Sequence, residues 1–414
     1  MEKNSFIKLR LSVLMFLQFF CSGIIGPIMS LYLMKYLNFS GDGAGIILSM
    51  AGITAILSSI MGVLVSGKLM TVNRLLGICH LLAAAFIIML TFQKHFGSVL
   101  FLYLMYTLCF GCTNGCVSAI VFQNQKDAGK NYGGIQMWGS IGWISAGWLF
   151  SFFWLRNLDG AEAMSRLVDS LKISGGISLL LFVYTFFLPQ KKLESYTRKS
   201  LLPREAIAVF EKPRNLFLAA VIFITFCSFQ YYLFSISPFL LQSRYDEAAI
   251  MPLSGVAQIS EAISLGILGY FITRKGYKKV LCFGLACNVL RYAALLASTA
   301  LPFVSGALVC HGLASAFFFT AACIYLDSQC RDSSVRASVQ QIVSILAYGF
   351  GVSFGNLFAG RASTLFGTEA AGFVNYTAFW GIPLAVSLVI LILFLFFFKA
   401  HPQKQGTGAV GFDI

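Results

Sequence analysis

The stretch "GVAQISEAISLG", residues 255–266, places an amide and a carboxylate inside an otherwise apolar run. Gln258 and Glu261 are three residues apart, so on a helix they share one face. Ionisable groups at bilayer depth normally face a cavity or a partner, and they mark substrate or proton paths. This face therefore predicts hydrogen bonding to a polar solute, together with gain and loss of a proton by Glu261.

Two candidate partners for Glu261 lie in later apolar runs. Arg291 and His311 occupy runs that follow each other as antiparallel neighbours, at similar expected depth. The three side chains could form one buried network, because compensation lowers the cost of burying charge. Burial favours the protonated carboxyl and a nearby guanidinium favours the carboxylate, so a change in either could couple proton flux to transport. His311 could relay a proton or bind substrate. The alternative is a static Glu–Arg pair that holds helices together.

Another polar helix face lies in the first half of the chain. Gln136, Ser140 and Trp143 fall at successive helical turns in "QMWGSIGW". An amide, a hydroxyl and an indole ring on one face are a plausible platform for a sugar ring or a base. Anchoring of the tryptophan at the membrane interface is an equal alternative. Gln18 and His80 have no obvious charged partner, and for both we expect packing roles.

These residues need a membrane frame. The chain has 414 residues, of which 58% are hydrophobic and 11% charged. Apolar segments recur at about the 20 residues that span a bilayer as helix. We therefore expect an all-α polytopic membrane protein with twelve transmembrane helices in two six-helix halves. The expected spans are 9–34, 43–66, 71–93, 97–123, 135–155, 171–189, 214–241, 250–273, 278–299, 302–327, 337–361 and 372–398.

The longest polar connection divides the spans into two sets of six. The expected parts are an N-terminal bundle at 1–190, a cytoplasmic linker at 191–213, a C-terminal bundle at 214–400 and a cytoplasmic tail at 401–414. Most of the 30 Lys and Arg residues fall on the side of the termini and the linker, which predicts that both termini are cytoplasmic. The net charge of +14 therefore reflects topology, and we expect no nucleic-acid partner.

Several classes of protein are disfavoured by missing motifs. The chain has no GxxxxGK[ST] phosphate loop and no HExxH pair, so neither an enzyme nor an ATP-driven pump is expected. Cys109, Cys112 and Cys116 share a helix face without a His or carboxylate, and we expect packing there rather than a metal. We expect no cofactor beyond the proton as coupling ion, and a monomer in the lipid bilayer.

The chain resembles the major facilitator superfamily. It looks most like the bacterial nucleoside:proton symporters and is more distantly similar to the lactose permease group. The segments that carry the resemblance are "FLQFF" at 16–20, "GICHLLAA" at 77–84, "QMWGSIGWI" at 136–144, "QISE" at 258–261, "GYKKVL" at 276–281, "LRYAALLA" at 290–297 and "VRASVQ" at 335–340. The resemblance implies alternating access around a central cavity. It also implies that a nucleoside is bound by Gln258 and Glu261, with Gln230, Ser140 and Trp143 as further cavity residues.

The chain departs from these relatives at charged positions. Gln136 stands where they place an arginine, and Ala316 stands where they have an acidic residue in the tenth span. Arg291 and His311 match in position the arginine and histidine that the lactose permease group uses around its proton-coupling carboxylate. In that alignment Gln258, not Glu261, occupies the place of the carboxylate.

The sequence thus predicts a proton-coupled secondary transporter that imports nucleosides across the bacterial inner membrane. Glu261, Arg291 and His311 are the expected proton-coupling residues. The expected substrate-binding residues are Gln136, Ser140, Trp143, Gln230, Gln258, Glu261 and His311. The alternatives are a symporter for an oligosaccharide or other sugar, a drug exporter and a non-transporting membrane receptor.

Overall fold

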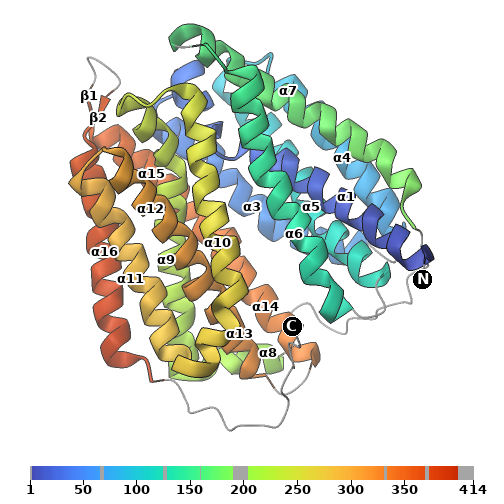
Figure 1. Cartoon of the computed structure of the whole chain (residues 1–414), viewed down its shortest axis with the longest axis vertical. Helices are drawn as coiled ribbons and strands as arrows, with labels where there is room; N and C mark the ends of the chain where they lie inside the picture. The colour runs from blue at the N-terminus through green and yellow to red at the C-terminus, as the bar shows by residue number, and fades with distance from the viewer. Residues whose placement is uncertain are drawn as a thin grey trace.

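The computed structural model places the helices in two groups that meet at one end and diverge toward the other (Figure 1). It describes residues 2–65, 70–124, 128–158, 160–189, 204–330, 333–368 and 373–399. Part of the expected linker, residues 191–203, and the expected tail, residues 401–414, lie outside this range. The expected domain boundaries stay predictions.

The first helix group contains the elements before the central connection. It comprises α1 (Glu2–Ile25), α2 (Met29–Leu31), η1 (Tyr32–Tyr36), α3 (Gly41–Val65), α4 (Val72–Leu90), α5 (Phe96–Asn124), α6 (Ala128–Leu149), η2 (Phe150–Trp154), α7 (Gly160–Tyr184) and η3 (Thr185–Phe187). Within it, α1 packs on α6 and α7, and α4 packs on α5 and α7.

The second helix group begins with a short helix in the expected linker, α8 (Arg204–Glu211). Its long helices are α9 (Pro213–Gln242), α10 (Glu247–Lys275), α11 (Tyr277–Ala297) and α16 (Tyr376–Phe397). Two further long helices each contain a π-helical segment. The first consists of α12 (Leu301–Ala314), η4 (Ser315–Thr320) and α13 (Ala321–Ser328), and the second of α14 (Ser333–Ser344), η5 (Ile345–Gly351) and α15 (Val352–Leu365). A small antiparallel hairpin, β1 (Gly367–Thr368) and β2 (Phe373–Val374), precedes α16.

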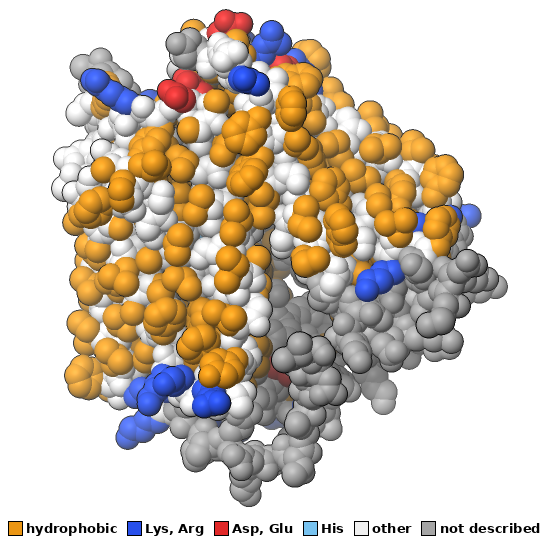
Figure 2. Space-filling view, in the orientation of Figure 1, with side chains coloured by type: hydrophobic (Ala, Val, Ile, Leu, Met, Phe, Trp, Pro, Cys, Tyr) orange, Lys and Arg blue, Asp and Glu red, His pale blue; other side chains and the backbone are white. Residues whose placement is uncertain are grey.

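The outer surface is that of a membrane protein. Hydrophobic side chains cover the flanks of both groups, and charged side chains gather at the two ends (Figure 2). Within the described residues, 11 helices are long and apolar enough to cross a membrane. The expected fifth span, 135–155, forms α6 and η2 but is not among these 11. Its glycines permit close packing on α1, since a Cβ at Gly142 would lie 2.3 Å from the Phe16 carbonyl oxygen.

The two groups are in close contact where α3 begins and α15 ends, which we call the joined end. Small residues let the two backbones touch. A Cβ on Gly41 would lie 2.6 Å from the carbonyl oxygen of Gly360. Nearby, the Asn356 side chain donates to the Leu48 carbonyl oxygen at 3.1 Å.

An ion pair also spans the joined end. Arg361 Nη1 lies 3.1 Å from Asp42 Oδ2, but the two side chains are 63% and 34% exposed. Exposed pairs of this kind contribute about 0–1 kcal/mol. The joined end is therefore held mainly by backbone-to-backbone packing of α3 on α15.

Candidate functional site

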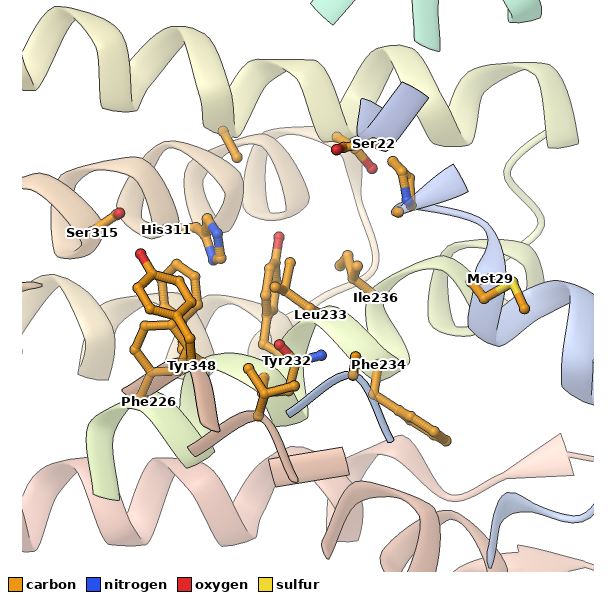
Figure 3. Close-up of a pocket in the computed structure, with 18 of the residues that line it drawn as sticks. Ser22, Met29, Phe226, Tyr232, Leu233, Phe234, Ile236, His311, Ser315 and Tyr348 are labelled. Atoms are coloured by element: carbon orange, nitrogen blue, oxygen red, sulfur yellow. The ribbon is translucent and has the colours of Figure 1, made fainter. Parts of the chain in front are cut away.

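A cavity of about 640 Å³ lies between the two helix groups. Figure 3 shows His311 and Ser315 on one side of it, with the rings of Phe226 and Tyr348 facing them. The expected site residues that line it are Trp143, Gln230, Gln258, Glu261 and His311. The structure thus brings five of the seven expected substrate-binding residues to one cavity.

Glu261 has a neutral partner in this cavity. Ser315 Oγ donates to Glu261 Oε1 at 2.7 Å. The contact forms because α10 and α12 touch through their backbones, with a Cβ on Gly312 falling 2.5 Å from the Glu261 nitrogen. No ion pair to Glu261 is found among the described residues. Glu261 can therefore gain a proton without losing a cationic partner.

Arg291 is fully buried and points to other groups. Its Nη1 donates to His311 Nδ1 at 2.7 Å, and its Nη2 donates to Asn288 Oδ1 at 2.5 Å and to the Tyr292 hydroxyl at 2.7 Å. A guanidinium has no acceptor, so His311 Nδ1 must accept. Neutral His311 then carries its proton on Nε2. The expected network of three groups forms only in part. The Arg291–His311 contact is present, but no hydrogen bond or ion pair joins Glu261 to Arg291 in the described part of the chain, so the prediction of that pair is wrong.

Aromatic rings surround this guanidinium. Arg291 Cζ lies 5.1, 4.6 and 4.5 Å from the ring centroids of Phe229, Tyr232 and Tyr292. The His311 ring stacks on Phe229, with centroids 3.9 Å apart. Ring faces attract a cation, so these three rings compensate part of the buried charge. Arg291 is thus a fully buried residue behind the cavity wall that orients His311.

Arg291→Lys is expected to destabilise the protein. An ammonium cannot reproduce the planar fork that contacts His311, Asn288 and Tyr292 together. Each buried group left unpaired costs about 1–3 kcal/mol. The measurement is the thermal unfolding midpoint of the purified protein in detergent, which should fall by several degrees. The matched control is Arg361→Lys at the exposed ion pair, which should change it little. Equal midpoints for the two variants would contradict this account of Arg291.

Gln230 connects the cavity to the joined end. Its Nε2 donates to Asn356 Oδ1 at 3.2 Å, and Asn356 in turn donates to α3 at Leu48. Gln230 and Asn356 both line the cavity. A ligand that competes for either amide would therefore act directly on the contact between the two helix groups.

The expected platform on α6 is divided. Trp143 lines this cavity and also a second one of about 840 Å³. Gln136 lines only the second cavity of these two, and Ser140, which is half-buried, lines neither. Positions 136, 140 and 143 share a broad helix face, but the cavities meet only part of it. The place of the acidic residue in relatives, Ala316, is fully buried in the apolar core of the second group.

Some functional groups were missed by reasoning from the sequence. Ser315 follows His311 by one helical turn in "HGLAS", and this spacing was the available signal. Gln18 and His80 were expected only to pack, yet His80 Nε2 lies 2.9 Å from Gln18 Oε1. Neutral partners on different helices leave no charge pattern in a sequence.

Two helix groups that meet at one end, around a mostly apolar cavity with a few polar side chains, have the architecture of a secondary transporter of the major facilitator fold rather than that of an enzyme. The family model described as "Nucleoside H+ symporter" matches residues 5–403, so the chain belongs to that family. These findings confirm the family and the fold class that the sequence predicted.

Individual relatives match over nearly their whole length. The chain is similar to the nucleoside permease NupG of Escherichia coli (strain K12), with 26% identity over 425 residues, covering 97% of this chain and 98% of that protein. It is equally similar to the xanthosine permease of the same organism, with 26% identity over 428 residues and coverage of 98% and 99%. The crystal structure of the nucleoside transporter NupG superimposes with a TM-score of 0.84 at 22% identity, covering 95% of this chain and 100% of that one.

Proposed function

We propose that this protein imports nucleosides together with protons across the bacterial inner membrane by alternating access. Both termini would face the cytoplasm, and the protein would act as a monomer. One observation carries the proposal: Gln258 and Glu261 line a cavity between the two helix groups, and Glu261 has a hydroxyl rather than a cation as its partner. Family membership and the names of the two permeases support the substrate class.

The cavity offers complementary groups for a nucleoside. The Glu261 carboxylate accepts hydrogen bonds from ribose hydroxyls, and Gln258 can both donate and accept. The Trp143 ring offers a face for the flat base. His311 donates through Nε2, because Arg291 occupies Nδ1. A solute that lacks these hydroxyls would leave buried polar groups unpaired, which is how the site selects.

Proton coupling follows from the cost of burying a carboxylate. When the groups rearrange to close the cavity to water, a solute-loaded carrier with a charged Glu261 is expensive to close unless a proton neutralises the carboxylate. The loaded, protonated carrier can therefore change conformation more readily than the singly loaded one. Arg291 acts on this step through His311, whose orientation it fixes.

The substrate class is tested by uptake into proteoliposomes under an inward proton gradient. We expect labelled uridine and inosine to accumulate, and unlabelled nucleosides but not lactose or sucrose to compete. Ile263→Ala is a matched control, because Ile263 is 63% exposed two residues from Glu261 and should leave uptake unchanged. Uptake of disaccharides without uptake of nucleosides would overturn the proposal in favour of the sugar symporter.

A further inference from the structure

The central cavity continues into the second cavity of about 840 Å³. The residues that line both are Ser22, Ala51, Trp143 and Tyr348. From there the second cavity extends to Met15 in the middle of α1 and to Val72, the first residue of α4. It therefore leads away from the joined end, toward the end where the helix groups diverge (Figure 1). A solute that leaves toward that end passes the walls of the second cavity.

A chain of hydrogen bonds with a fixed direction lies in one wall of this cavity. The Thr113 hydroxyl donates to the Phe110 carbonyl oxygen at 2.6 Å, which uses its single proton. Thr113 must then accept from Gln18 Nε2, at 2.6 Å. This fixes the Gln18 amide with its oxygen toward His80, so His80 Nε2 carries the proton in their 2.9 Å contact. The second Gln18 N–H donates to Asn114 Oδ1 at 3.0 Å.

The free end of the chain is the amide nitrogen of Asn114. Its oxygen is occupied by Gln18, so its NH₂ group is left to donate. Asn114 is exposed and lines the second cavity, and no acceptor for Asn114 Nδ2 occurs among the hydrogen bonds of the described residues. By contrast Gln18, His80 and Thr113 are all at most 1% exposed. A buried, directed chain thus holds two donors ready at the cavity wall.

We propose that Asn114 donates a hydrogen bond to a carbonyl oxygen of the nucleobase, and that Gln18 and His80 are positioning residues for it. The assignment rests on the proposed function. Glu261 provides an acceptor for ribose hydroxyls in the first cavity, Trp143 provides a ring face where the cavities meet, and Asn114 provides donors in the second. A nucleoside laid across this junction directs the base edge farthest from its ribose toward Asn114. That edge carries the 6-oxo group of inosine and the 4-oxo group of uridine.

A ligand without the 6-oxo group distinguishes a hydrogen bond from Asn114 to the base from a merely structural role of Asn114. Binding to the purified full-length protein is measured by calorimetry for inosine and for purine riboside, which lacks the 6-oxo group. Asn114→Ala should weaken inosine binding about tenfold, the value of one hydrogen bond. It should change purine riboside binding by less than about twofold, because the base of that ligand has no 6-oxo group for Asn114 to contact. Gln18→Ala should also weaken inosine binding more than purine riboside binding.

Two further variants complete the test. Asn114→Asp keeps the size of the side chain but replaces donors with acceptors, so it should show the same selectivity for the oxo ligand. Ser118→Ala alters another residue of the same cavity wall, one helical turn away, and should weaken neither ligand. Equal losses for inosine and purine riboside in the Asn114 variants, or no loss for either, would overturn the assignment. Absence of nucleoside binding by the wild-type protein would instead contradict the proposed function.

Discussion

Glu261→Gln is expected to abolish accumulation of nucleosides against their gradient while sparing nucleoside exchange. Glutamine has the shape of the protonated side chain and can still accept from Ser315, whose hydroxyl donates to Oε1 at 2.7 Å in the native protein. It cannot release a proton. The carrier would then behave permanently as if Glu261 were protonated. Nucleosides could still cross the membrane, but the proton gradient could not drive their accumulation.

The size of this effect follows from the coupling. One proton moving down one pH unit supplies about 1.4 kcal/mol, which supports about tenfold accumulation of one solute. The measurement compares gradient-driven uptake with exchange at equal nucleoside concentrations on both sides of proteoliposomes. We expect the accumulation ratio of the variant to fall to about one, with exchange retained. Undiminished accumulation would show that Glu261 is not the coupling group. Ser315→Ala, which removes the hydroxyl but keeps the carboxyl, should retain accumulation.

Gly52→Leu is expected to stop transport without removing the binding site. A Cβ at position 52 would lie 2.3 Å from both the Gly349 carbonyl oxygen and Ser353 Oγ, and 2.7 Å from the Ser353 backbone nitrogen. Two of these atoms belong to the backbone of the opposite helix group, so they cannot turn away as a side chain would. The two helix groups could then no longer close on each other along α3, and the cycle would lack one of its two conformations.

The consequence is a shift of population. Overpacking commonly costs about 1–3 kcal/mol, which changes the ratio of two conformations by about fivefold to 150-fold. We expect nucleoside uptake to be lost while calorimetric binding in detergent is retained. Gly381→Leu on α16 is the matched control, because nothing lies within 4 Å of its Cβ position and transport should continue. Full transport by Gly52→Leu would show that α3 and α15 need not close on each other.

Much of the frame could be predicted from the sequence because each span carries its own signal. Apolar length marked the helices, and the spacing of Gln258 and Glu261 placed both on one cavity wall. The depth of Arg291 and His311 on antiparallel neighbours anticipated their contact at 2.7 Å. These predictions depend on one helix or on two consecutive helices, where chain connectivity limits the possible arrangements.

The Glu261–Arg291 contact was predicted from the sequence but does not form, because depth along a helix does not fix which neighbour a side chain faces. Depth along a helix can be read from the sequence, but rotation about the helix axis depends on packing with helices far away in the chain. The rings of Phe229 and Tyr232 on α9 turn Arg291 toward His311, whereas the backbone contact of α12 with α10 brings Ser315 to Glu261. The same limit applies to the Gln18–His80 contact, which joins α1 to α4 across 62 positions.

Nucleoside and proton should cross the membrane together. The most direct measurement follows the pH inside proteoliposomes with a trapped dye while nucleoside is added outside, with no pH gradient imposed. Uridine or inosine should acidify the interior in proportion to the nucleoside taken up. Lactose should not, and Glu261→Gln should remove the acidification. Entry of nucleoside with no movement of protons would contradict the account.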